Sequence, residues 1–405
     1  MMSNLQQDVM ARLNGYRSRM ETFLSKLVQL KSENPPGNSY PDCRDLIRNE
    51  ICSLGLEPVV HPLGNADSPI YAVQTFVGNG KPAVYFHGHY DVVPAFSAQQ
   101  FVPEIKNGKM FGRGTADMKG GLALMLYAAK VASECAPALT GRVGVTFVPD
   151  EETGGAKGSE LLVRSGVLGK DGIAMLTPEP TSGRIWNSSR GALSLRITTH
   201  GKSVHVGEHY KGTSAFDDMV AITNHLFEFR SQLAKRETDF PISPPAARKS
   251  ILLVGGTVQG GTNFNCVPDE CTFTVDRRFN PEELLEKEEQ ALLDAIHSAA
   301  HPQRPPSIEV FQRAQVSATS ADSEPARALA KNAAAVLGQA PAFEMCPGLL
   351  ETRFYSQAGI PAFAFGPGLL SVAHGPNEFV DLNTVMDYAA IYALTAIDLL
   401  STSKG

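Results

Sequence analysis

The chain has 405 residues, of which 43% are hydrophobic and 19% charged, and its formal net charge is −6. Lysine and arginine do not cluster, which argues against a nucleic-acid partner, and no apolar run reaches the ~18 residues that a membrane span needs. The six scattered cysteines contain no Cys-x-x-Cys pair, which argues against a disulfide framework or a thiolate metal site. We therefore expect a cytoplasmic protein with no membrane partner, and its length predicts two domains.

The first 94 residues lead to a candidate metal-binding strand. Their periodicity predicts helices at 6–31 and 43–54 and strands at 57–60 and 70–76. The apolar run 83–86 predicts a buried strand, which Pro94 must end. Residues two apart on a strand point to the same face, so His89 and Asp91 project together. An imidazole beside a carboxylate suits a metal ligand, although a lone histidine at a strand end is more often structural.

Two acidic turns come next along the chain. Asp117 lies in a glycine-rich turn before a helical run at 122–131, where the helix dipole favours an ionised carboxylate; a simple helix N-cap is an equal alternative. The apolar run 143–148 then delivers the acids 150–152. Acidic runs are usually solvated surface. Three acids at the end of a buried strand, however, repel one another unless a cation or a proton compensates them.

Two further strand-like runs end near a polar side chain of the same kind. The run 173–176 leads to Glu179, and the run 362–365 leads to His374. Four predicted strands thus each deliver a histidine or an acid at their C-terminal side, the edge where α/β sheets keep their active sites. This convergence predicts a common site.

The segment between residues 190 and 312 has a different pattern. It predicts strands at 191–199, 251–258, 270–277 and 307–312 and helices at 215–234 and 281–299. The order β-α-β-β-α-β is that of a ferredoxin-like sandwich. We therefore expect an α/β protein in which a second domain, 191–312, interrupts a first domain made of residues 1–190 and 313–405. The first domain ends in an amphipathic helix at 383–400.

The collected side chains have the chemistry of a two-metal site. They supply two imidazoles and three carboxylates: His89, Asp117, Glu152, Glu179 and His374. This set, without a thiolate, suits two divalent cations, either zinc or, in substitution, cobalt or manganese. Two such ions can polarise a carbonyl group and lower the pKa of a bridging water, giving a hydroxide. Glu151 is then the candidate general base, which takes the proton of the water and passes it to a leaving nitrogen.

The order of these segments resembles a known family. The matching segments are 89–94, 112–121, 150–155 and 179–181, followed by His374. The chain is similar to the dinuclear zinc hydrolases that include acetylornithine deacetylase, succinyl-diaminopimelate desuccinylase, aminoacylase and glutamate carboxypeptidase. The resemblance implies a zinc-peptidase-like catalytic domain with a mixed central sheet flanked by helices. It also implies that Asp91 orients His89 and that Glu151 is the acid/base.

The resemblance further assigns the metal ligands. Asp117 would bridge the two metals. His89 and Glu179 would bind one ion, and Glu152 and His374 the other. A glutamate at the position of Glu179 goes with deacylases and carboxypeptidases more than with dipeptidases.

The inserted segment resembles the lid and dimerisation domain of the same family. His205 matches a lid histidine that reaches the active site of a partner subunit, which implies a homodimer; a surface-loop role is the alternative. Asn265 and Arg278 match substrate-binding positions, and a guanidinium suits a carboxylate. A turn residue and a surface ion pair are the alternatives for these two.

Two departures from the family pattern concern the substrate. His209 stands where the lid motif usually has proline, and residues 348–353 replace the usual Gly-Gly-Thr-Asp-Ala-Arg type of sequence. They weaken the case for acetylornithine or succinyl-diaminopimelate as the substrate. We expect a deacylase that cleaves the amide bond of an N-acyl amino acid or a related amide. The alternatives are a metallo-carboxypeptidase or dipeptidase acting on a dipeptide-like substrate and, in another class, an inactive binding or dimerisation homologue.

Overall fold

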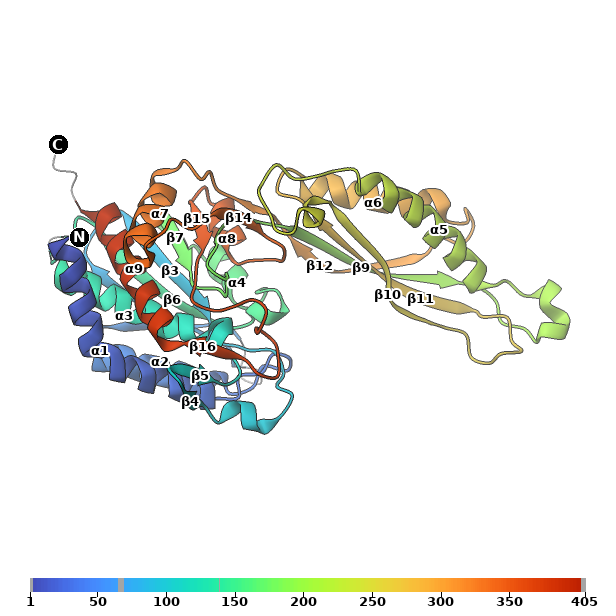
Figure 1. Ribbon diagram of the computed structural model, residues 1–405. Helices are drawn as coiled ribbons and strands as arrows, with labels where there is room; N and C mark the ends of the chain where they lie inside the picture. The colour runs from blue at the N-terminus through green and yellow to red at the C-terminus, as the bar shows by residue number, and fades with distance from the viewer. Residues whose placement is uncertain (1–2, 65–68, 138, 402–405) are drawn as a thin grey trace. The chain divides into compact units, whose positions relative to one another are not determined.

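The computed structural model describes residues 3–64, 69–137 and 139–401, which form two compact units (Figure 1). Unit 1 comprises Met1–Asn187, Ala318–Glu344 and Glu351–Gly405. Unit 2 comprises Ser188–Ser317 and the short segment Met345–Leu350. In the part of the chain that the structure describes, no helix is long and apolar enough to cross a membrane.

A mixed sheet forms the centre of unit 1, as predicted. Its strands run in the order β1-β2-β6-β3-β7-β15-β8-β13, and β14 pairs with β8. Their bounds are β1 Pro58–Pro62, β2 Tyr71–Gly78, β3 Ala83–His89, β6 Arg142–Val148, β7 Gly172–Thr177, β8 Ile185–Ser189, β13 Ser317–Ala318, β14 Phe343–Cys346 and β15 Ala362–Ala364. Strands β6, β3, β7 and β15 are mutually parallel. Their carboxyl ends therefore meet at one edge of the sheet.

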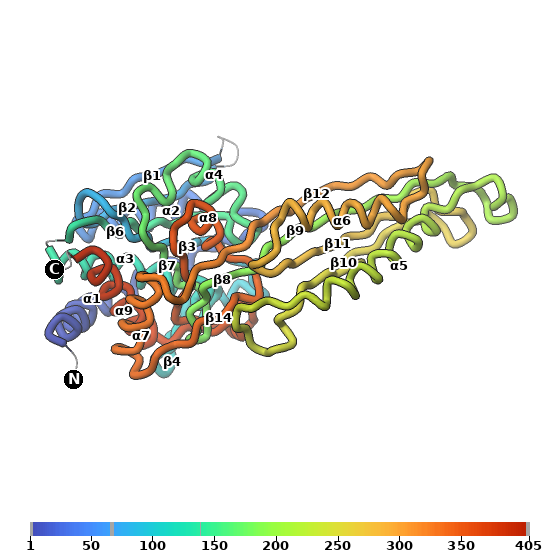
Figure 2. The backbone as a smooth tube through the Cα atoms, turned by 90° about the horizontal axis from the view of Figure 1, so that it is seen from above, coloured from blue at the N-terminus to red at the C-terminus, as the bar shows by residue number. Residues whose placement is uncertain are grey.

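Helices cover both faces of this sheet (Figure 2). One face carries α1 Asn4–Gln29, α2 Tyr40–Ser53, α3 Gly120–Cys135, α7 Glu324–Leu337 and α9 Leu382–Leu400. The other face carries the shorter α4 Ser159–Arg164 and α8 Thr352–Gln357. Strand β3 shows why both faces are covered: Val84 and Phe86 enter one core, and Ala83 and Tyr85 enter the other.

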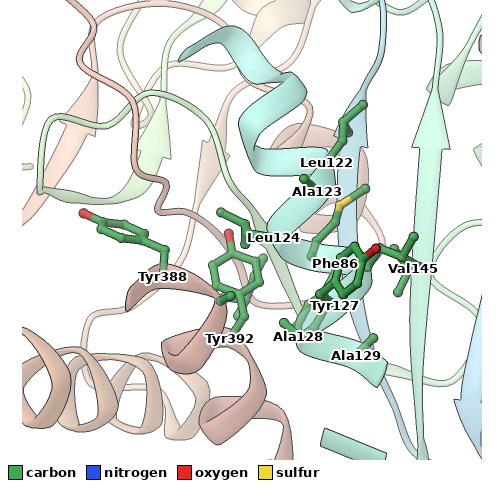
Figure 3. Packing of buried hydrophobic residues seen from close by; sticks show 14 of the residues in the cluster. Phe86, Leu122, Ala123, Leu124, Tyr127, Ala128, Ala129, Val145, Tyr388 and Tyr392 are labelled. Carbon is green, nitrogen blue, oxygen red and sulfur yellow. The ribbon is translucent and has the colours of Figure 1, made fainter. Parts of the chain in front are cut away.

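The larger core fixes β3 in place. Phe86 packs against Tyr392 of α9 with ring centroids 4.9 Å apart (Figure 3). Leu122, Leu124 and Val145 belong to the same buried cluster. Burying a phenylalanine side chain stabilises the fold by roughly 1.5–3 kcal/mol. The strand that ends at His89 is therefore rigidly supported.

Unit 2 has the predicted ferredoxin-like fold. Its elements are β9 Gly191–His200, α5 Ala215–Leu233, β10 Ile251–Gly260, β11 Glu270–Phe279, α6 Leu285–Ala299 and β12 Ser307–Ala314. The sheet is antiparallel, in the order β10-β11-β9-β12. Leu193, Leu195 and Ile197 of β9 alternate toward one core, which α5 and α6 cover. The helix predicted at 281–299 begins only at Leu285, because Leu284 before it has an extended backbone.

Candidate active site

The parallel strands bring the predicted site residues to one edge of the sheet in unit 1. His89 is the last residue of β3. The turn after β6 carries Glu151 and Glu152, and Glu179 follows β7 by two residues. His374 lies in the loop that follows β15. Asp117 comes from the turn Thr115–Lys119, which leads into α3.

These side chains form two clusters that share one carboxylate. His89 Nε2 lies 3.3 Å from Asp117 Oδ1 and 3.8 Å from Glu179 Oε1. His374 Nε2 lies 3.1 Å from Asp117 Oδ2 and 3.2 Å from Glu152 Oε2. In each cluster the candidate ligand atoms all lie within 4.8 Å of one another. The two oxygens of Asp117 thus face different clusters, as a bridging ligand requires.

The donor set fits metal ions better than it fits a closed hydrogen-bond network. His89 is 1% exposed, and its Nε2 atom has no hydrogen-bond partner among the described residues. Burial and the neighbouring charge of Asp117 raise the pKa of Glu179 well above its usual range. Such a group of buried acids is stable when cations or protons compensate it. Imidazole and carboxylate ligands without a thiolate are those expected of zinc and related divalent ions.

Glu151 lies next to the ligand Glu152 but belongs to neither cluster. Its Oε2 atom lies 3.9 Å from His89 Nε2. Burial, with added repulsion from Glu152, raises the pKa of Glu151 to about 8, against the attraction of His89. A carboxylate beside two candidate metal positions, but ligating neither, can exchange a proton with a water molecule between them.

Asp91 connects the strand of His89 to the turn of Glu151. Its carboxylate accepts the backbone N–H groups of Glu151 and Glu152 at 3.2 and 3.1 Å, and Asn34 Nδ2 donates to it at 2.9 Å. His89 Nδ1 lies 3.0 Å from the carbonyl oxygen of Asp91 and 3.5 Å from its carboxylate. Asp91 therefore contacts His89 mainly through the main chain, while its carboxylate fixes the acidic turn.

Sequence reasoning missed a buried pair beneath this turn. His87 Nε2 is hydrogen-bonded to Glu351 Oε2 at 2.7 Å, and Tyr355 contacts the other ring nitrogen of His87 at 3.2 Å. Gly155 has φ +71°, and a Cβ there would lie 2.9 Å from Glu351 Oε1. The Gly154-Gly155 sequence is thus required both by the left-handed backbone and by the close approach of Glu351. In the sequence, the segment 348–353 stands out only as a departure from the family pattern.

The three predicted substrate-binding residues belong to unit 2. His205 is exposed and its Nδ1 accepts the N–H of Gly207 at 3.1 Å. Its backbone pairs with that of Cys266, next to Asn265. Arg278 on β11 donates from Nε to both oxygens of Asp276, at 3.0 and 3.1 Å. Their role in substrate binding stays a prediction.

Comparison with known proteins identifies the family. Residues 85–398, which include all the clustered side chains, match peptidase family M20/M25/M40. The chain belongs to this family. The suspected relationship to the dinuclear deacylases and carboxypeptidases is thereby confirmed.

Individual relatives of this M20 protein span most of its length. It is 25% identical over 408 residues to the probable succinyl-diaminopimelate desuccinylase of Staphylococcus aureus strain N315, covering 93% of this chain and 97% of that protein. It is 29% identical over 329 residues to the acetylornithine deacetylase of Myxococcus xanthus, covering 80% and 82%. The M20 family metallo-carboxypeptidase Sso-CP2 from Sulfolobus solfataricus has the same fold, with a TM-score of 0.75 at 18% identity over 94% and 98% of the two chains.

The family, its named members and the paired clusters together make this M20 chain a metal-dependent amidohydrolase. Divalent metal ions are its cofactors.

Proposed function

We propose that this M20 chain hydrolyses the amide bond of an N-acyl amino acid and that its two metal ions are zinc. The observation that supports this most strongly is Asp117, whose two oxygens face separate imidazole-carboxylate clusters. In this proposal Asp117 would hold both ions, with His89 and Glu179 as further ligands of one and Glu152 and His374 as further ligands of the other.

The metal ions and the protein side chains then have separate roles in the reaction. When bound, the two dications polarise the substrate carbonyl and lower the pKa of a water molecule toward neutrality. Glu151 accepts a proton as the water oxygen forms its bond to the carbonyl carbon. It delivers that proton to the amide nitrogen as the C–N bond breaks, so that a carboxylic acid and an amine are the products. Asp91 keeps Glu151 in position through the two backbone N–H groups that its carboxylate accepts.

We assign substrate binding to His205, Asn265 and Arg278 of unit 2. His205 steadies the negative charge that develops on the carbonyl oxygen. The guanidinium of Arg278 pairs with the carboxylate of the amino-acid portion, since its planar fork suits two parallel hydrogen bonds. Asn265 adds an amide donor for the same substrate. This assignment rests on the motif resemblance.

A metallo-carboxypeptidase is the second candidate, favoured by the fold shared with Sso-CP2. The two activities differ in what occupies the carbonyl side of the scissile bond. A deacylase requires a simple acyl group there, whereas a peptidase accepts an amino acid. A dipeptidase in addition requires a free α-amino group.

A hydrolysis screen tests these proposals. Purified protein, stripped of metal and reloaded with zinc, cobalt or manganese, is incubated with N-acetyl, N-succinyl and N-benzoyl amino acids, free dipeptides and N-capped dipeptides. We expect release of the free amino acid from the N-acyl series. Cleavage confined to dipeptides would replace the deacylase by a peptidase. No hydrolysis of any amide with any of these metals would contradict the proposed function.

We further propose that the protein is a homodimer, formed through unit 2. Apolar side chains there are exposed on helix α5 and on the edge strand β10: Phe216 (50%), Val220 (37%), Phe227 (40%), Ile251 (44%) and Leu253 (52%). An edge strand offers unpaired backbone groups to a second chain. Sedimentation of Leu253→Asp should give a monomer. Phe96→Asp, at a residue of unit 1 that is 70% exposed, is the control and should leave the dimer intact. A monomeric wild-type protein would contradict this proposal.

We also propose a cytoplasmic location. All six cysteines are free thiols, which suits a reducing compartment. Localisation of a fluorescently tagged chain checks it, and an exported protein would contradict it.

A further inference from the structure

Unit 1 contains a buried ion pair that belongs to neither ligand cluster. Arg113 is 1% exposed, the side chain of Glu378 is fully buried, and Arg113 Nη1 donates to Glu378 Oε2 at 2.6 Å. The small sheet β16-β5-β4, in which β4 is Glu104–Lys106, brings the two together. In it, β5 (Lys109–Phe111) pairs with β16 (Phe379–Asp381), so that Phe111 faces Phe379. A buried ion pair of this kind contributes little net stability. Stability alone therefore does not explain why the pair is present here.

The carboxylate of Glu378 fixes the turn that carries Asp117. It accepts three backbone N–H groups, from Gly114 at 3.0 Å, Ala116 at 2.9 Å and Asp117 at 3.1 Å. Charge-assisted hydrogen bonds are roughly twice as strong as neutral ones. The main chain of the bridging acid is therefore held by a single buried carboxylate.

The second arm of Arg113 reaches the loop of His374. Its Nη2 donates to the carbonyl oxygen of His374 at 3.2 Å and to that of Pro94 at 3.4 Å. His374 has φ +62°, a left-handed conformation that is unfavourable for a residue other than glycine. Its side chain is also 52% exposed, so packing does little to hold it. The hydrogen bond from Arg113 supplies the restraint that packing does not.

We infer that Arg113 and Glu378 are positioning residues that set the distance between Asp117 and His374. The pair ties both main-chain segments to one rigid salt bridge, so that the imidazole and the shared carboxylate meet in the cluster with Glu152 before a metal binds. Partners of metal ligands act in this way: their loss typically lowers metal affinity by about 10–100-fold. This inference rests on the proposed two-metal function.

Cobalt titration of the metal-free protein tests the inference. Equilibrium dialysis gives the affinity of each site, and visible absorption reports the coordination of bound Co²⁺. Wild type should bind two ions. Arg113→Lys keeps a positive charge beside Glu378 but loses the planar fork that reaches the carbonyl of His374. We expect it to bind one ion about 10–100-fold more weakly and the other nearly unchanged. His374→Ala is the reference, since it loses a ligand of the same site.

A matched control separates positioning from a general loss of stability. Arg277 of unit 2 is also a fully buried arginine, paired with Glu283 and Glu288 at 2.8 and 2.7 Å. Arg277→Lys should bind two cobalt ions with wild-type affinity. Two wild-type sites in Arg113→Lys, or an equal loss at both sites, would overturn the inference while leaving the proposed function intact. A wild-type protein that binds no cobalt would overturn both.

A second variant keeps the test decisive if Arg113→Lys does not fold. Glu378→Gln has the same shape but loses the charge that holds Arg113 and the three N–H groups. Because these N–H groups belong to the turn of the bridging Asp117, we expect both cobalt sites to weaken by about tenfold or more and the visible spectrum to change. Unchanged affinities in a folded Glu378→Gln protein would refute the role of the pair.

Discussion

Two groups of buried acids, one in each unit, differ in how their charge is compensated. In unit 2, Arg277 donates to Glu283 and Glu288 at 2.8 and 2.7 Å, and Arg236 contacts both acids at 2.8 Å. Two positive and two negative charges thus balance within the cluster. Such a network needs no ligand, and we regard it as structural.

The carboxylates of the candidate metal site in unit 1 are, by comparison, not balanced by positive charge. Three carboxylates share only the two imidazoles of His89 and His374, and His89 Nε2 is left without a hydrogen bond in the described part of the chain. The comparison teaches that the number of buried acids does not identify a site. The useful signal is uncompensated charge beside a buried imidazole nitrogen that has no hydrogen bond.

The largest effect on activity should come from replacing Glu151, the candidate general base. Glu151→Ala should lower kcat by about 10²–10⁴-fold, the usual contribution of a general acid/base, while two metal ions still bind, because its side chain is not a proposed ligand. Steady-state kinetics and metal analysis of the same preparation measure both. Glu160→Ala is the control: this residue forms an exposed pair with Arg164 on α4, and the variant should keep full activity. Retained turnover in Glu151→Ala would remove Glu151 from its role.

The arginine-glutamate cluster of unit 2 (Arg236, Arg277, Glu283 and Glu288) should affect the stability of that unit and not metal binding or catalysis. Arg277→Met leaves Glu283 and Glu288 buried with only the half-exposed Arg236, so we expect the unfolding free energy of unit 2 to fall by about 3 kcal/mol. Urea unfolding measures this, and cobalt binding should not change. The exposed pair of Arg313 and Glu289 gives the control, since Arg313→Met should cost less than about 1 kcal/mol. Equal losses in the two variants would mean that the buried cluster is not special.

Both the fold and the proposed ligands could be predicted from apolar runs and the polar residues at their C-terminal ends, but partners distant in the sequence could not. The strand that the sequence predicted to reach Pro94, with His89 and Asp91 on one face, ends at His89, because Val92 beyond it bonds to the backbone of Ser32 and Asn34. Helix α7 was missed, although its alanine-rich sequence places Ala326, Leu329 and Ala333 on one buried face. Glu351 pairs with His87 across 264 positions, and a single sequence gives no sign of such a contact. The pairing of Arg113 with Glu378, across 265 positions, was missed for the same reason.

Removal of the metal ions should affect unit 1 and leave unit 2 unchanged. Dialysis against a chelator should abolish activity and destabilise unit 1. At a free metal concentration 100 times the Kd, each ion bound only by the folded state contributes about 2.7 kcal/mol. Unit 2 should keep its unfolding midpoint, because its acids are compensated by arginine. Calorimetry with and without zinc, followed by reloading to recover activity, measures both effects. A shift confined to unit 2 would contradict the proposed metal site.

The smallest predicted effect is the loss, at low pH, of the stability that the arginine-glutamate cluster gives to unit 2. Burial opposes ionisation of Glu283, but hydrogen bonds from Ser250 and from the backbone of Asn280, with the charge of Arg277, outweigh it and lower the pKa below its ordinary value of 4.5. A lowered pKa stabilises the fold at pH values above the unfolded pKa. That contribution is lost as the pH falls from about 4.5 through the lower folded value.

Glu283→Gln should therefore destabilise unit 2 near neutral pH, and the difference from wild type should narrow as the pH falls below about 4.5. Urea unfolding of the metal-free protein at a series of pH values measures it without interference from metal release. Arg313 also lowers the pKa of Glu289, but that pair is largely solvated, so Glu289→Gln should show the same trend at a much smaller amplitude. A difference for Glu283→Gln that stays constant with pH would show that the cluster stabilises unit 2 by its shape and not by its charge.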